Sequence, residues 1–211
     1  MQRRINRARL AAVLAAVALL AGCKVVVTAP PPSAGGQPAA ASGQPAAPGG
    51  TTASGKLTAV PDEGQVTYSV HLTHCHAGDG GQLPDPHCTP GSVDPAITQA
   101  DIGRTICRSG YTAKVRPPSS ETGKAKYDVA YPAYGIPSRD ASELDHLVSL
   151  ELGGSNDITN LWPEVGSLPN PKDKVENALH RAVCDGRVSL RAAQQAIASD
   201  WMTAEAKLGL G

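Results

Sequence analysis

Aromatic residues are scarce in this chain, and a net charge is missing altogether. Phenylalanine is absent, and the two tryptophans and five tyrosines make up 3% of the 211 residues. A platform of several aromatic rings that stacks nucleic-acid bases is therefore not expected. The 19 basic residues equal the 19 acidic residues in number. This balance excludes a strongly basic nucleic-acid coat or a polybasic membrane binder for the chain as a whole.

The zero net charge is an average over unlike segments. Residues 1–22 carry four arginines and no acidic residue, and residues 10–21 form a short apolar run. A basic start followed by such a run is typical of a secretory signal, and twelve apolar residues are too few to span a bilayer comfortably. Without residues 1–22, 15 basic residues face 19 acidic ones, a formal net charge of −4. Contact with nucleic acid is then expected to be local or metal-mediated.

The apolar run ends in Leu20-Ala21-Gly22-Cys23. This ending resembles the bacterial lipoprotein signal, in which the cysteine becomes the lipidated N-terminus after cleavage. The resemblance implies lipidation of Cys23 and anchoring at the extracytoplasmic face of the cell membrane. An ordinary secretion signal, or an uncleaved anchor, would equally export the chain.

Residues 23–60 are expected to form a disordered linker. Twenty of the 28 residues over 29–56 are Ala, Gly or Pro, and the first charge in that stretch is Lys56. Such a composition buries too little apolar surface to offset its ordering entropy. The linker would hold the rest of the chain away from a membrane. That rest is expected as a His- and Cys-rich strand and loop segment over 61–87 and a domain over 88–205.

Four cysteines follow the linker, an even number that favours two disulfides in an exported protein. They are Cys75, Cys88, Cys107 and Cys184. Of the three possible pairings, we prefer the local pair Cys75–Cys88 and the long-range pair Cys107–Cys184. Metal ligation by these cysteines is the alternative.

Histidines gather around the first two cysteines. Four of the six in the chain lie within 17 positions, namely His71, His74, His76 and His87. His and Cys are metal ligands, but this spacing matches no standard zinc site. A metal-binding surface lipoprotein that uses the cluster from His71 to His76 is therefore one alternative function.

The segment from residue 144 to 184 is expected to fold as strand, turn, strand and helix. Apolar residues alternate imperfectly over 144–152 and stop at a Gly-Gly pair, and residues 158–162 supply the returning strand. Apolar residues recur every four positions over 172–184, which indicates a helix. A last helix, capped by Ser189, is expected to run to Trp201. The sequence therefore predicts an α+β fold.

This segment resembles the HNH endonuclease family, whose ββα-metal site has the same order of elements. The resemblance is carried by Asp145-His146, by Gly153-Gly154, and by Asn160, which lies 14 positions after the histidine. It implies a small ββα-metal domain with flanking helices. It also implies metal-dependent hydrolysis of phosphodiester bonds in DNA or RNA by an exported lipoprotein.

Residue chemistry suggests a role for each residue of that site. Neutral His146 would act as the general base that takes a proton from water, and Asn160 would hold its ring. Asp145 and Asn170 would supply oxygen ligands, a set that favours Mg²⁺, with Mn²⁺ as a substitute. His180 would replace or supplement Asn170, and a nitrogen ligand would favour Zn²⁺ or Ni²⁺.

Plainer interpretations remain beside these roles. His146 would be a histidine bonded within the hairpin, Asn170 a helix entry before proline, and His180 a solvated helix residue. The protein would then be a catalytically silent HNH-like module for binding or structure. The modest basic cluster in the sequence consists of Arg104, Arg108, Lys114 and Arg116. These four basic residues would either contact the phosphates of a nucleic acid or lie in solvent without a partner.

Overall fold

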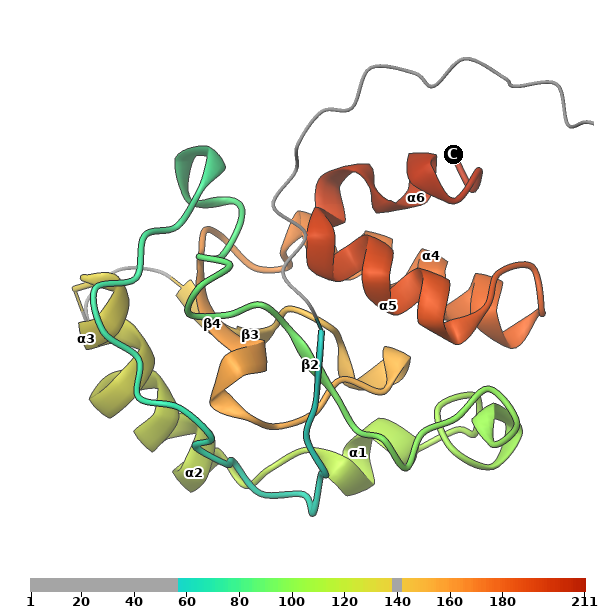
Figure 1. The fold of residues 1–211 in the computed structure, drawn as a ribbon, viewed down its shortest axis with the longest axis horizontal. Coiled ribbons are helices and arrows are strands. Elements are labelled where there is room, and N and C mark those ends of the chain that lie inside the picture. Colours follow the sequence, from blue (N-terminus) through green and yellow to red (C-terminus); the bar gives the residue numbers. More distant parts are fainter. Residues whose placement is uncertain (1–56, 138–141) are drawn as a thin grey trace, which may run out of the picture. The chain divides into compact units, whose positions relative to one another are not determined.

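The computed structural model describes residues 57–137 and 142–211 (Figure 1). The expected signal peptide, Cys23 and the linker as far as residue 56 lie outside the described residues. Helices and two small sheets make up an α+β fold, as predicted. None of the helices over 57–137 and 142–211 combines the length and the hydropathy needed to cross a membrane.

The elements are short, and several helices follow one another closely. Strands β1 (Thr58–Ala59) and β2 (Ser92–Val93) pair in parallel, and β3 (Ser142–His146) and β4 (Leu161–Val165) pair antiparallel. The α-helices are α1 (Tyr111–Val115), α2 (Ser119–Lys124), α3 (Tyr131–Tyr134), α4 (Pro171–Cys184), α5 (Leu190–Ser199) and α6 (Ala204–Lys207). A π-helical segment, Ala125–Ala130, joins α2 to α3. The 3-10 helices span Asp79–Gly81, Ile102–Arg104, Leu150–Leu152, Ile158–Asn160 and Trp201–Thr203.

The β3–β4 hairpin carries the residues on which the functional prediction depends. Its strands pair over all five positions, with His146 opposite Leu161. Since successive side chains on a strand point to opposite faces, Glu143 and Asp145 share one face. Leu144 and His146 lie on the other. The two residues of the Asp-His pair therefore work on opposite sides of the hairpin.

The turn of this hairpin differs from the prediction. Strand β3 ends at His146 and β4 begins at Leu161, whereas the sequence predicts strands over 144–152 and 158–162. Two 3-10 helices replace the predicted strand ends. After His146 the two arms are joined by one backbone hydrogen bond, from the N–H of Leu147 to the carbonyl of Asn160 at 2.8 Å, and then by the side chain of Asn160.

Asn160 is fully buried, and both the oxygen and the nitrogen of its side-chain amide have hydrogen-bond partners. Its amide oxygen accepts from the backbone N–H of Val148 at 2.9 Å, and its amide nitrogen donates to the carbonyls of Val148 and Ser155, each at 2.9 Å. The chain passes so close that a Cβ on Gly154 would lie 1.7 Å from the Val148 carbonyl oxygen. The second glycine of the Gly-Gly pair is therefore required by the turn.

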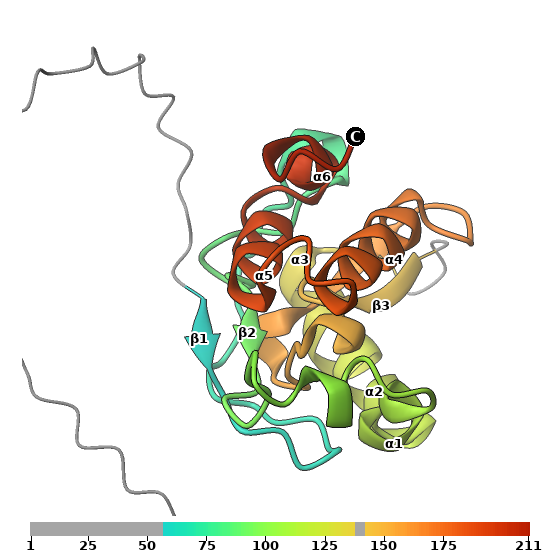
Figure 2. The same cartoon turned by 90° about the vertical axis from the view of Figure 1, so that its right-hand side faces the viewer.

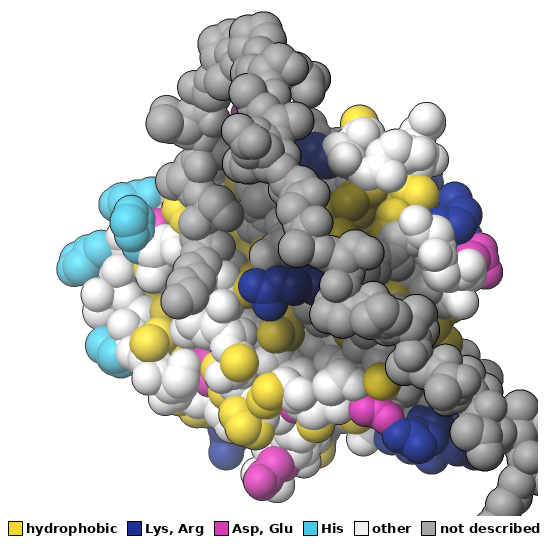
Figure 3. Space-filling model, turned by 45° about the vertical axis from the view of Figure 1, so that its right-hand side comes forward, with side chains coloured by type: hydrophobic (Ala, Val, Ile, Leu, Met, Phe, Trp, Pro, Cys, Tyr) yellow, Lys and Arg dark blue, Asp and Glu magenta, His cyan; other side chains and the backbone are white. Residues whose placement is uncertain are grey.

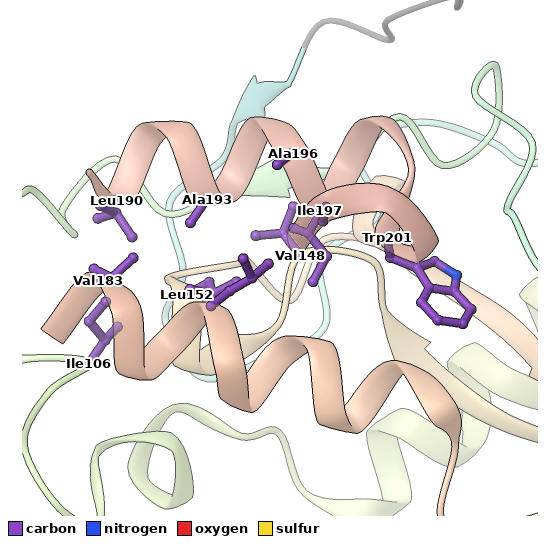
Figure 4. Close-up of a cluster of buried hydrophobic side chains, with 11 residues drawn as sticks. Ile106, Val148, Leu152, Val183, Leu190, Ala193, Ala196, Ile197 and Trp201 are labelled. Atoms are coloured by element: carbon purple, nitrogen blue, oxygen red, sulfur yellow. The ribbon is translucent and has the colours of Figure 1, made fainter. Parts of the chain in front are cut away.

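Two buried hydrophobic clusters lie on either side of this turn. Leu147 packs in the cluster that contains Trp162 and the Cys75–Cys88 disulfide, and Val148 packs in the other. Figure 4 shows Val148 in the second cluster, between α4 and α5. The members of that second cluster are Ile106, Val148, Leu152, Leu179, Val183, Leu190, Ala193, Ala196, Ile197, Trp201 and Ala204.

The two predicted C-terminal helices and the preferred disulfides are confirmed. Helices α4 and α5 run beside each other, with β3 next to α4 (Figure 2). The Ser189 hydroxyl caps α5 by accepting from the backbone N–H of Ala192 at 3.2 Å. The disulfides join Cys75 to Cys88 and Cys107 to Cys184, and the second ties α4 to the loop after Ile102–Arg104.

We predict that Gly154→Ala destabilises the fold, because its methyl group would collide with the Val148 carbonyl. The free energy of unfolding, measured with denaturant, should fall by about 3 kcal/mol or more. Gly123→Ala is the matched control, since Gly123 lies in α2 and an alanine methyl there would have no atom within 4 Å. It should raise stability by up to about 1 kcal/mol. Equal losses in the two variants would contradict this account of the turn.

Candidate functional site

The His146 side chain is fixed by a chain of hydrogen bonds that ends at a carboxylate. His146 is 7% exposed, and its Nε2 lies 2.7 Å from the amide oxygen of Asn156. The amide nitrogen of Asn156 donates to both carboxylate oxygens of Asp62, at 2.9 and 2.8 Å, and to the carbonyl of Val115 at 2.7 Å. Three separate segments thus converge on one amide group and hold the ring.

These partners determine which nitrogen of His146 carries the proton. The Asp62 carboxylate and the Val115 carbonyl only accept hydrogen bonds, so the amide nitrogen of Asn156 must face them. Its oxygen must then face His146, and an amide oxygen also only accepts. The hydrogen therefore sits on Nε2, and the lone pair is on Nδ1. Burial lowers the pKa of His146, and the positive charge of Arg116 lowers it further, so the ring is neutral at pH 7.

The residue that holds the ring is Asn156, and the prediction from the sequence that Asn160 holds it is wrong. Asn160 instead closes the hairpin turn. Both are amides in the same turn, and only the 3-10 helix Ile158–Asn160 determines which of them reaches the ring. The sequence alone does not separate the two asparagines, because both lie in the same polar segment, Ser155 to Asn160.

His146 lines a cavity of about 470 Å³ on its face of the hairpin, which we call the His146 cavity. Its walls are Arg116, Pro117, Ser119, Thr122, Gly123, Lys126, Tyr127, Leu144, His146 and Leu161. Two cationic side chains and three hydroxyl-bearing side chains therefore line the same cavity as the imidazole. Of the basic cluster noted in the sequence, Arg116 alone belongs to this cavity, and Lys126 was not anticipated. The lining suits an anion that carries several oxygen atoms.

The opposite face of the hairpin holds a buried ion cluster. Lys172, from the first turn of α4, is 1% exposed, and its Nζ lies 2.7 Å from Oδ2 of Asp145. The same nitrogen donates to the carbonyl of His146 at 2.7 Å and hydrogen-bonds Glu176. Lys172 was not among the predicted site residues, because a lysine in a first helical turn usually extends into solvent.

Three acidic side chains come together beside this lysine. One oxygen from each of Glu143, Asp145 and Glu164 lies within 4.8 Å of the others, and we call these residues the carboxylate cluster. Burial opposes ionisation of Asp145, but the Lys172 ammonium outweighs it and lowers the pKa of that carboxyl. Burial and the charge of Asp145 raise the pKa of Glu164 to about 8. At pH 7, Glu164 therefore keeps its proton, while the Lys172 ammonium compensates Asp145.

The structure brings Asn170 to this cluster but leaves His180 apart from it. Asn170 precedes α4, and its amide nitrogen donates to Glu143. His180 lies eight residues beyond Lys172, about 12 Å along the helix. Its Nε2 is 2.9 Å from the carbonyl of Ile106, and its Nδ1 is 3.6 Å from a carboxylate oxygen of Glu151.

His180 does have two sulfur atoms near it. Its ring nitrogen and the sulfurs of Cys107 and Cys184 lie within 4.8 Å of one another. Those sulfurs are joined in a disulfide, and metal binding by cysteine requires the thiolate. With the disulfide formed, the three residues are not a ligand set.

The expected metal ligands do not form a set that fits Mg²⁺. Of Asp145, Asn170 and His180, the first pairs with an ammonium, the second donates to Glu143, and the third lies two helical turns away. The carboxylate cluster supplies hard oxygens, but the Lys172 ammonium holds Oδ2 of Asp145 and the amide nitrogen of Asn170 holds an oxygen of Glu143. The chemistry of these donors therefore does not match the implied divalent ion.

The histidine cluster does not converge either. His71, His74, His76 and His87 are exposed, and Figure 3 shows histidine side chains spread along one edge of the surface. Three of them border a surface cavity of about 490 Å³ whose lining includes Leu72, Val129 and Pro132. Within the described residues, no three ligand atoms of this cluster lie within 4.8 Å of one another. Its two cysteines are joined in a disulfide.

Comparison with known proteins adds no assignment. No protein-family model matches this chain, and no curated protein or solved structure matches it. Function must therefore be inferred from the geometry of the His146 cavity and the buried ion cluster.

We predict that stability falls as pH rises from 5 to 8, because of Glu164. In the folded protein its carboxyl keeps the proton up to a pKa of about 8, whereas its ordinary pKa is 4.5. The folded state thus binds more protons across this range, and stability should decline by up to about 1.4 kcal/mol per pH unit. Denaturant unfolding of Glu164→Gln should show a shallower decline. The exposed Glu63→Gln should follow the wild-type curve, and a Glu164→Gln curve parallel to wild type would contradict the assignment.

Proposed function

We propose that this protein is a phosphodiester hydrolase that cleaves DNA or RNA, with His146 as its general base. The observation that carries the proposal is a neutral histidine, held in one tautomer, in a cavity that also holds two cations. A base near neutral pH and fixed positive charge are what cleavage of an anionic diester requires. The HNH-like order of β3, β4 and α4 supports the same function.

The proton step uses the free nitrogen of His146. Nδ1 takes a proton from a water molecule, and the water oxygen forms a bond to phosphorus as the bond from phosphorus to the leaving sugar oxygen breaks. That oxygen takes a proton from solvent, and the imidazolium returns its proton to solvent. Asn156 and Asp62 hold the ring throughout and stabilise the charged form through Nε2–H.

The negative charge of the phosphate is met by the protein's own side chains. Arg116 and Lys126 line the His146 cavity, with the hydroxyls of Ser119 and Thr122 beside them. An arginine fork binds two phosphate oxygens at once. The expected Mg²⁺ ligands do not assemble, so these side chains carry the charge compensation in the proposed mechanism.

The composition of residues 1–60 supports attachment of this hydrolase to the outer face of a membrane. The lipidation expected at Cys23 would anchor it there, and the Ala/Gly/Pro-rich linker would provide reach. The formal charge of −4 after removal of residues 1–22 gives no general attraction to nucleic acid. The substrate is therefore expected to bind locally, at the His146 cavity.

We predict that His146→Ala lowers the rate of nucleic-acid cleavage by a factor of about 10² or more, as loss of a general base does. Cleavage of plasmid DNA and of a mixed RNA, followed on gels, measures this. His87→Ala is the control, since that histidine is exposed and does not line the cavity. Wild-type protein that binds nucleic acid but never cleaves it, with both disulfides formed, would favour the silent module instead.

We also predict how kcat/KM for nucleic-acid cleavage depends on pH. Because the pKa of His146 is lowered, kcat/KM should rise with pH below about 6.5 and be level at pH 7. Arg116→Gln removes a positive charge that lowers this pKa, so the acid limb should shift upward by about 0.3 to 1 pH unit. Arg108→Gln, an exposed arginine outside the cavity, should leave the limb in place. A downward shift in Arg116→Gln would refute the role of His146.

A further inference from the structure

The Lys172 side chain extends from the first turn of α4 to the end of β3, where its Nζ contacts three oxygen atoms. Its nitrogen is 2.7 Å from Oδ2 of Asp145, 2.7 Å from the carbonyl oxygen of His146, and hydrogen-bonded to Glu176. An ammonium has three N–H bonds to donate, so these three oxygens satisfy it. The side chain is 1% exposed, and a substrate cannot touch it.

This group stands where the HNH resemblance places a metal. The implied Mg²⁺ would be bound by Asp145, and carboxylate and carbonyl oxygens are its preferred ligands. Those ligand types are present, but they are directed at Nζ of Lys172. A divalent ion at Oδ2 of Asp145 would have to displace the ammonium from that oxygen. The ammonium would keep the His146 carbonyl and Glu176 as partners, and two cations would then lie close together in a buried site, which is unfavourable.

We propose that Lys172 is a resident cation that takes the place of the divalent metal between β3 and α4. The ammonium compensates Asp145 and holds the carbonyl of His146, so it fixes the backbone of the proposed base from the face opposite to the cavity. Lys172 is thus a positioning residue for His146. This positioning role rests on the proposed function, whereas the replacement of the metal does not.

Titration of the protein with a divalent metal tests whether Lys172 takes the place of the metal. Wild-type protein, with both disulfides formed, is titrated with Mn²⁺ by calorimetry and by paramagnetic broadening of the Asp145 and His146 resonances. No broadening is expected at about 1 mM Mn²⁺, a concentration at which weak protein sites for hard cations fill. The thermal midpoint should be the same with EDTA as with Mn²⁺.

Removal of the lysine should create the site that it replaces. Lys172→Ala leaves Asp145 and Glu176 without their cation, so Mn²⁺ should bind at least tenfold more tightly than to wild type and raise the thermal midpoint. Lys174→Ala is the matched control, because it removes an exposed lysine from the same helix. It should behave as wild type.

Some results would overturn the proposal. One is Mn²⁺ binding to the wild type below about 1 mM that Asp145→Asn abolishes. That measurement decides the question even when Lys172→Ala does not fold. Cleavage that EDTA abolishes and Mg²⁺ restores would overturn the resident cation while leaving the proposed hydrolysis intact. Absence of any cleavage would remove the proposed function but leave the titration result standing.

Discussion

The first turn of α4 is joined to the end of the hairpin strand β3 by one buried charge, the ammonium of Lys172. A buried charge is tolerated only where polar partners surround it. Its partners here are a side chain and a backbone carbonyl at the end of β3, and a carboxylate one turn further along α4. Since one side chain must reach all three, the start of α4 can lie only close to the end of β3. That placement fixes the carbonyl of His146, while Asn156 fixes its ring from the other face.

The alternation of side chains along β3 separates two kinds of chemistry. Asp145 faces the buried ion cluster, and its neighbour His146 faces the cavity that Arg116 lines. The charges of one face are compensated by Lys172, and the imidazole on the other face is kept neutral mainly by its own burial. The backbone between the two residues is the link, because Lys172 binds the carbonyl of the same residue whose ring Asn156 holds.

The parts of this fold that depend on local pattern could be predicted from the sequence. Helix α4 follows from the spacing of Leu179 and Val183, and α5 from its Ser189 cap. The formation of two disulfides follows from the even number of cysteines after the expected signal peptide. The turn could not be predicted in detail, since it is set by the side chain of Asn160 and not by strand propensity.

The site was harder to predict because it depends on contacts between side chains that lie far apart in the sequence. Lys172 has the sequence context of an exposed residue, and only its packing against β3 buries it. Asn156 and Asn160 are equivalent by composition, and their roles separate only through the 3-10 helix between them. His180 lies on the predicted helix, but the rise along that helix carries it away from Asp145.

Leu147 and Val148 follow each other in the chain, yet each belongs to a different hydrophobic cluster. Local unfolding of one cluster therefore displaces the backbone of a residue next to the other cluster. The side chain of Asn160 also binds the backbone of Val148 at this junction. The two hydrophobic clusters are in this way expected to unfold together as one cooperative unit. The amides that exchange most slowly with solvent should be those around this junction, where partial opening has no independent route.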